Sequence, residues 1–129
     1  MISVDTNVIV RFLTGDDKLQ FEKSKALFSK ENIIITTSVI LECEWVLRYA
    51  YHFKQPEITI AFQSLFGLPN VQLEEPLVVS NAIDWHQNGM DFADALHLAQ
   101  SKDAEAFVTF DKKLIKSASK NTNIQVREP

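Results

Sequence analysis

The feature that most constrains the fold is the alternation of short apolar runs with helical stretches along the chain. The run Ile33-Ile34-Ile35 is continuous and β-branched, which is typical of a strand buried on both faces. Further short runs at 2–4, 71–73, 106–110 and 124–126 are separated by segments with helical patterns. Strands separated by helices require crossover connections, so the sequence predicts an α/β fold with a parallel sheet covered on both faces.

The length predicts one domain over residues 1–129, since no linker, repeat or low-complexity tract divides the chain. Apolar residues make up 46% and charged residues 23% of the sequence, which excludes a disordered chain or a coiled coil. No apolar run approaches the ~18 residues of a membrane span. The first residues do not resemble a secretory signal, and the single cysteine fits a reducing compartment, so we expect a cytoplasmic protein.

The charge balance restricts binding to nucleic acids. The formal net charge is −4, and residues 31–100 alone carry two basic and nine acidic side chains. Phosphates are repelled by such a segment. A nucleic-acid partner therefore requires metal ions on the acidic segment, or contact through the more basic segments 11–30 and 101–129.

Two aspartates follow predicted strands directly. Asp5 ends the run 2–4, and Asp111 follows the run 106–110. In open parallel sheets, ligands bind beyond the carboxyl ends of the strands. Both residues are therefore candidate metal ligands or general bases, and the alternative for each is an ordinary helix N-cap.

Three further carboxylates belong to predicted helices. Glu42 borders the apolar face of a helix over 38–52, and the alternative for it is an ordinary surface glutamate, paired with the neighbouring Arg48 or Tyr49. Asp91 and Asp94 share the first turn of a helix over 91–102, where Asp91 also suits the N-cap and Asp94 the helix dipole.

A crevice holding Asp5, Glu42, Asp94 and Asp111 would concentrate negative charge, which a hard divalent cation relieves. Oxygen ligands suit Mg²⁺ or Mn²⁺, and such sites serve phosphodiester cleavage by lowering the pKa of a metal-bound water. Asp94 and His97 also have a spacing that permits a transition metal, but no cluster of Cys and His supports zinc.

These motifs resemble the PIN domains and, within them, the VapC-type toxins of toxin–antitoxin pairs. The resemblance covers essentially the whole chain, and its carriers are Val4-Asp5-Thr6-Asn7, Leu41-Glu42-Cys43-Glu44-Trp45-Val46-Leu47, Asp91-Phe92-Ala93-Asp94-Ala95-Leu96-His97-Leu98-Ala99 and Thr109-Phe110-Asp111-Lys112-Lys113-Leu114. It implies a three-layer sandwich with a five-stranded parallel sheet. It further implies a Mg²⁺- or Mn²⁺-dependent endoribonuclease that cuts structured RNA such as tRNA or rRNA, a cognate antitoxin and a homodimer.

The resemblance also assigns roles. Asp5 and Asp94 correspond to direct metal ligands, Glu42 to a direct or water-mediated ligand, and Asp111 to a ligand or a supporting residue. Asp91 is implied as a cap with a supporting role. Thr6, Asn7 and Thr109 are implied as hydrogen-bond partners of the carboxylates or of the scissile phosphate.

A second face of the predicted helix 38–52 suggests a protein interface. Leu41, Trp45 and Tyr49 lie away from its core stripe, and Trp and Tyr are favoured anchors of protein contacts. The alternative is that the next helix, over 57–66, covers this face within the chain.

Two other functions remain open on the sequence alone. A phosphatase with an aspartyl nucleophile shares the fold class, but Asn7 occupies the position where that chemistry usually requires a second aspartate. A non-catalytic binding module with the same fold is the other alternative, and the intact acidic set counts against it.

Overall fold

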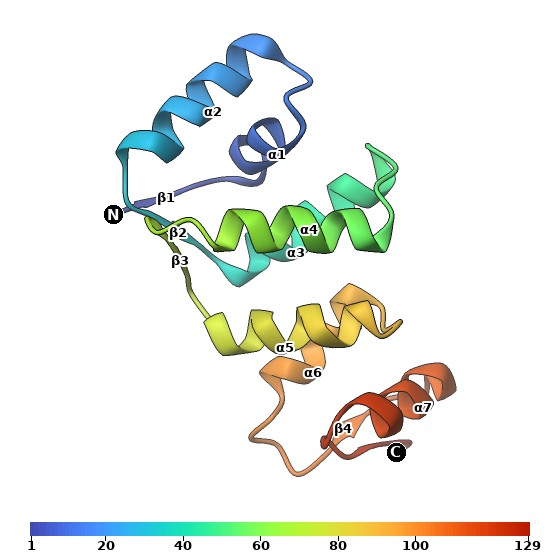
Figure 1. The fold of residues 1–129 in the computed structure, drawn as a ribbon. Helices are drawn as coiled ribbons and strands as arrows, with labels where there is room; N and C mark the ends of the chain where they lie inside the picture. The colour runs from blue at the N-terminus through green and yellow to red at the C-terminus, as the bar shows by residue number, and fades with distance from the viewer. The chain divides into compact units, whose positions relative to one another are not determined.

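A computed structural model describes residues 1–129, which form two compact units, Met1–Pro76 and Leu77–Pro129. Helices and strands alternate through both (Figure 1).

The N-terminal unit is built around a three-stranded parallel sheet. Its elements are β1 (Ile2–Ser3), α1 (Thr6–Thr14), α2 (Lys18–Lys30), β2 (Ile33–Ile35), α3 (Thr37–Tyr49), α4 (Gln55–Phe66) and β3 (Val71–Leu73). The strand order is β1-β2-β3, with Ile2 opposite Ile33 and Ile33 opposite Val71. Ile33 and Ile35 of the central strand are completely buried, as the continuous isoleucine run predicts.

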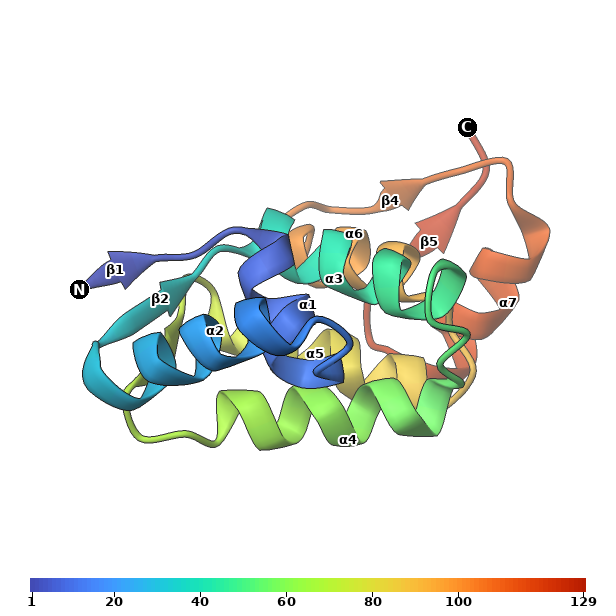
Figure 2. The same ribbon diagram turned by 90° about the horizontal axis from the view of Figure 1, so that it is seen from above.

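Helices α1 and α2 lie next to one another in this unit (Figure 2). Phe12 of α1 stacks on Phe28 of α2 with ring centroids 4.4 Å apart, and on Phe21 at 6.5 Å. Gly15 ends α1 with a φ of 65°, a left-handed conformation that favours glycine at a helix C-terminus. Aromatic packing and a sharp turn together hold the two helices as a pair.

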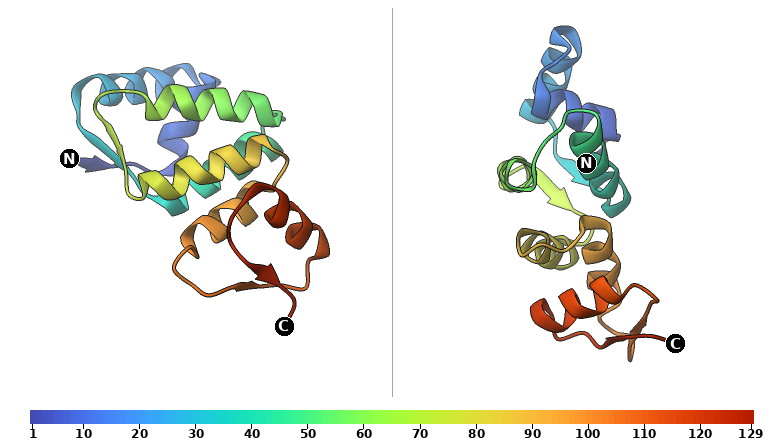
Figure 3. Two further views of the ribbon diagram at one scale, coloured as in Figure 1. Left: turned by 60° about the horizontal axis from the view of Figure 1, so that its bottom comes forward. Right: turned by 90° about the vertical axis from the view of Figure 1, so that its right-hand side faces the viewer.

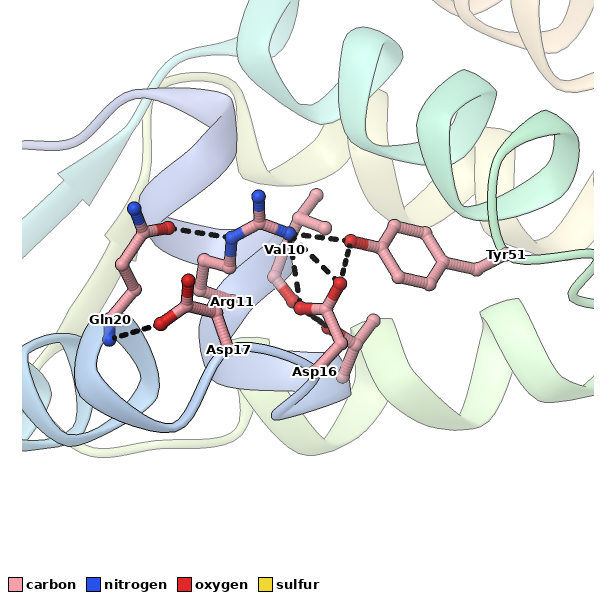
Figure 4. A network of polar contacts seen from close by, with 7 residues as sticks. Val10, Arg11, Asp16, Asp17, Gln20 and Tyr51 are labelled. Atoms are coloured by element: carbon pink, nitrogen blue, oxygen red, sulfur yellow. Dashed lines mark hydrogen bonds and ion pairs between the residues drawn. The ribbon is translucent and has the colours of Figure 1, made fainter.

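A polar network fastens these helices to the segment between α3 and α4 (Figure 4). Arg11 Nη1 donates to both carboxylate oxygens of Asp16, at 3.0 and 3.1 Å, and to Tyr51 Oη at 2.6 Å. Tyr51 Oη in turn donates to Asp16 Oδ2 at 2.6 Å. The Asp16 carboxylate therefore belongs to this network, and its neighbour Asp17 is the N-cap of α2.

The C-terminal unit contains α5 (Pro76–Gln87), which begins at the boundary, α6 (Phe92–Gln100), β4 (Phe107–Val108), α7 (Lys112–Asn121) and β5 (Val126–Arg127). Strands β4 and β5 pair in parallel, with Phe107 opposite Val126. Helix α7 forms the crossover between them, and the chain ends just after β5 (Figure 3). Val79, Phe92, Ala95 and Leu98 are buried.

The predicted α/β class is confirmed, and all five strands pair in parallel. Their hydrogen bonds form a three-stranded sheet in the first unit and a two-stranded sheet in the second, and not one five-stranded sheet. The strands are short: the run 106–110 pairs as a strand only over Phe107–Val108. The single domain over 1–129 stays a prediction. None of the helices has the length and apolar character to cross a membrane.

Candidate functional site

The first acidic residue stands where β1 leads into α1. Asp5 has an extended backbone, and its Oδ1 accepts a hydrogen bond from the Thr6 backbone N–H at 2.8 Å. The predicted N-cap role of Asp5 is therefore real. Its side chain nevertheless remains exposed, so capping leaves it accessible to a ligand.

Glu42 lies close to this helix start. The buried Thr6 donates its hydroxyl hydrogen bond to Glu42 Oε1, which joins α3 to the beginning of α1. Glu42 is exposed, as the alternative of a surface glutamate expects. Its pairing with Arg48 is not observed, because Arg48 forms its ion pair with Glu44, at 2.7 Å from Nε to Oε2. Asp5, Thr6 and Glu42 thus form one polar group in the N-terminal unit.

The negative charges of this group affect the pKa of the buried Cys43 thiol. Burial, followed by the negative charges of Glu42 and Asp5, raises the pKa of Cys43 to about 12, while a hydrogen bond with Thr6 acts in the opposite direction. Both carboxylates therefore act on the same point of α3. Their combined negative potential is of the kind that favours a cation.

The C-terminal unit carries the other acidic residues at the starts of two helices. Asp91 is the N-cap of α6, and its Oδ2 accepts from the Asp94 backbone N–H at 3.1 Å. Asp111 is the N-cap of α7, and its Oδ1 accepts from the Leu114 N–H at 3.1 Å. The backbone N–H of Asp111 donates to Thr109 Oγ1 at 3.0 Å, so Thr109 helps to fix the turn that presents Asp111.

These three aspartates line one hollow of ≈ 230 Å³, together with Gly89, Met90, Lys113, Leu114 and Ser117. The pKa of Asp94 is raised, first by partial burial and then by the charges of Asp91 and Asp111, with His97 opposing them. The carboxylates of α6 and α7 therefore repel one another across the hollow. A bound cation would remove this repulsion.

The acidic side chains do not form a complete metal site within either unit. Neither unit by itself gathers three or more His, Cys, Asp or Glu side chains closely enough to hold a metal ion. The candidates form two groups instead, Asp5 with Glu42 and Asp94 with Asp91 and Asp111. Their donors are carboxylate oxygens, which fit Mg²⁺ or Mn²⁺, ions that keep several water ligands and need few from the protein.

Asn7, which was also predicted at the site, does not line the hollow of Asp94. Asn7 is exposed next to Asp5 and lines a separate hollow of ≈ 280 Å³ with Arg11 and Lys23. Sequence reasoning did not single out Ser117, which lines the hollow of Asp94. The signal for it was available, because Ser117 follows Lys113 by four residues and so shares its face of α7.

The aromatic face of α3 is accessible. Trp45 and Tyr49 are 55% and 57% exposed, with ring centroids 5.1 Å apart, and Leu41 is half-buried. Helix α4 therefore does not cover Trp45 and Tyr49, which excludes the alternative that it does. Arg48 places its guanidinium over the Tyr49 ring at 4.5 Å and orders this face.

Comparison with known proteins identifies the family of the chain. The family model described as PIN domain matches residues 2–120, a span that includes Asp5, Glu42, Asp94 and Asp111. A search of curated proteins finds no match. PIN domains are generally metal-dependent nucleases, so the match supports a hydrolase at this coarse level. Because the matched span covers nearly the whole sequence, the chain belongs to the PIN domain family.

Proposed function

We propose that the protein is a Mg²⁺- or Mn²⁺-dependent endoribonuclease that acts as the VapC-type toxin of a toxin–antitoxin pair. One observation carries the proposal. Within a family of metal-dependent nucleases, this chain places Asp5, Asp94 and Asp111 at helix starts and links Glu42 to the helix of Asp5 through Thr6.

In this proposal each carboxylate has a role. Asp5 and Asp94 bind the metal directly, Glu42 binds it directly or through a water, and Asp111 binds or supports it. The metal, when bound, lowers the pKa of a water molecule and neutralises charge on the phosphate. Thr6 orients Glu42, Asp91 and Thr109 hold the first turns of α6 and α7, and Asn7 is available to the substrate.

The proposed substrate is structured RNA, such as tRNA or rRNA. Lys113 lines the hollow of Asp94, where its ammonium group suits a backbone phosphate. The proposed protein partners are a cognate antitoxin and a second copy of the chain, with Leu41, Trp45 and Tyr49 as the contact face. The proposed location is the cytoplasm.

The test that needs no knowledge of the RNA is a calorimetric titration with Mn²⁺. We expect saturable binding to the wild-type protein and loss of that binding in Asp94→Asn. Asp84→Asn is the matched control, because Asp84 is an exposed residue of α5 outside the hollow. A flat wild-type titration, or equal binding by wild type and Asp94→Asn, would contradict the metal site and favour a non-catalytic binding module.

Cleavage of RNA tests the reaction itself. With a total cellular RNA preparation, we expect fragments in Mn²⁺ and none in EDTA. Asp5→Asn and Asp94→Asn should each reduce the rate by roughly 100-fold or more, since loss even of a residue that only supports a metal ligand commonly costs about 10- to 100-fold. Fragments that persist in EDTA would contradict the proposal, and so would a trapped aspartyl-phosphate, which would indicate a phosphatase.

A further inference from the structure

The C-terminal unit contains a second hollow, which does not include the aspartates. Its volume is ≈ 500 Å³, within the range of pockets that hold small-molecule ligands. Residues of α5 and the final turns of α6 and α7 line it, and its main polar and aromatic residues are Asn81, Trp85, Lys102, Lys120, Asn121 and Asn123. No residue that lines it is acidic.

The charge of the hollow favours an anion. Lys102 and Lys120 are exposed and contribute two positive charges. The C-terminal ends of α6 and α7 oppose them, but a helix end is equivalent to only about half a negative charge and is screened within one turn. The two lysine charges outweigh the two half-charges of the helix ends, so the lining of the hollow carries a net positive charge. The chain as a whole has a net charge of −4.

The neutral residues of the hollow narrow the choice of anion. Trp85 is half-buried, so part of its indole is available for stacking. The amides of Asn81 and Asn123 combine donors with acceptors, which suits the edge of a nucleobase. A simple inorganic anion would use the lysines alone, whereas a phosphorylated nucleoside would use the lysines, the amides and the indole together.

The acidic residues lie at the starts of α6 and α7, whereas the hollow lies near the ends of the same two helices. Ala99, which lines the hollow, follows Asp94 by five positions along α6, and Lys120 follows Asp111 by nine positions along α7. At about 1.5 Å per residue, these distances are about 8 and 14 Å along the helix axes. A stacked nucleic-acid strand rises about 3.4 Å per nucleotide, so roughly four nucleotides span the longer distance.

From these observations we propose that this hollow binds a phosphorylated nucleoside, supplied by a nucleotide of the RNA substrate several positions from the scissile phosphate. Its assignment to the substrate strand rests on the proposed nuclease function. The binding chemistry rests only on Trp85, Lys102, Lys120 and the neighbouring amides.

Tryptophan fluorescence tests the proposal directly. With Trp45→Phe as the background, Trp85 is the only tryptophan of the chain. In EDTA, we expect a single-stranded RNA octamer of mixed sequence to quench Trp85 saturably, and more tightly than 5′-AMP does. EDTA removes any metal, so the measurement does not depend on the acidic residues or on cleavage.

Charge variants in the same background locate the binding. Lys102→Gln combined with Lys120→Gln should raise the Kd for the octamer by about tenfold or more, because two phosphate contacts are lost. Lys18→Gln combined with Lys30→Gln makes the same charge change on α2 and should alter the Kd by less than about twofold.

The outcomes separate the two proposals. No quenching, or equal effects of the two double variants, would overturn the nucleoside site while leaving the Mn²⁺ result intact. Binding of 5′-AMP as tight as that of the octamer would overturn the assignment to the RNA strand. Failure of the Mn²⁺ titration alone would overturn the nuclease and not the binding site.

Discussion

His52 is the one non-glycine residue of the chain with a positive φ, at 59°. It belongs to the connection between α3 and α4, next to Tyr51 of the polar network. Left-handed backbone is costly for most side chains, although histidine tolerates it better than β-branched residues do. The backbone of His52 is therefore mildly strained, and the hydrogen bonds of the adjacent Tyr51 help to hold this conformation.

Replacement of His52 tests this strain. We expect His52→Val to lower the free energy of unfolding by roughly 1–2 kcal/mol, because a β-branched side chain disfavours this φ. His52→Gly should leave the stability equal or slightly higher, since glycine adopts the conformation freely. Urea unfolding of both variants measures the two effects. Equal losses in both variants would show that histidine contacts matter more than backbone strain.

Helix α3 shows how far a sequence pattern can predict an element. Its burial of Ile40, Cys43 and Leu47 agrees with the predicted stripe. Glu44 is also buried, 1% exposed, and hydrophobic periodicity did not predict it because the pattern treats every glutamate as polar. The explanation is a partner: Arg48, four residues later, donates to both Glu44 oxygens, at 2.7 and 3.1 Å.

Arg48→Met should lower the free energy of unfolding by about 2 kcal/mol, because it leaves a buried carboxylate without its ion pair. This value is below the roughly 3–5 kcal/mol of a fully buried pair, since the Arg48 side chain is 36% exposed. Thermal unfolding measures the loss. The double variant Glu44→Leu with Arg48→Met should recover much of it, and a double variant as unstable as Arg48→Met would contradict this explanation.

The network that fastens α1 and α2 to the α3–α4 segment should depend on pH. The pKa of Asp16 is lowered, chiefly by the hydrogen bond from Tyr51. A carboxyl with a lowered folded pKa stabilises the protein above its unfolded pKa, about 3.9, and loses that contribution as the pH falls through the folded value. Tyr51→Phe should therefore be less stable than wild type at pH 7, with a difference that shrinks as the pH approaches 2.

Urea unfolding between pH 7 and pH 2 measures this difference. Tyr49→Phe is the control, because Tyr49 is exposed and contacts Arg48 and Trp45 rather than a carboxylate. Its difference from wild type should stay nearly constant with pH. A Tyr51→Phe difference that also stayed constant would mean that Asp16 does not carry the effect.

At the scale of the whole molecule, the sequence predicted types of element better than their pairing. The isoleucine run forms the central strand of its sheet, since a buried strand follows from a local residue pattern. The division of the strands into sheets of three and two was not predictable, because strand pairing depends on contacts distant in sequence. The apolar residue Leu19 of α2 is 67% exposed for a similar reason: helical spacing does not say which face of a helix packs against another element.

Association of two copies tests the aromatic face of α3. If Leu41, Trp45 and Tyr49 form the proposed dimer contact, light scattering should give about twice the chain mass of 14.7 kDa. Trp45→Ala combined with Tyr49→Ala should then give the monomer mass, because aromatic anchors dominate such contacts. Ile60→Ala, at another exposed apolar residue, is the control. An unchanged mass in the double variant would exclude this face.

The capping role of Asp5 and Asp111 has a genetic consequence. Asparagine caps a helix about as well as aspartate, so Asp→Asn at either position should cost the fold little while removing a negative charge. Every aspartate codon becomes an asparagine codon through one G-to-A transition. If these residues serve catalysis, inactive alleles are thus a single base change away and still encode a folded protein that retains its binding surfaces. Selection against a harmful activity can therefore act through inactive but folded variants as well as through truncated ones.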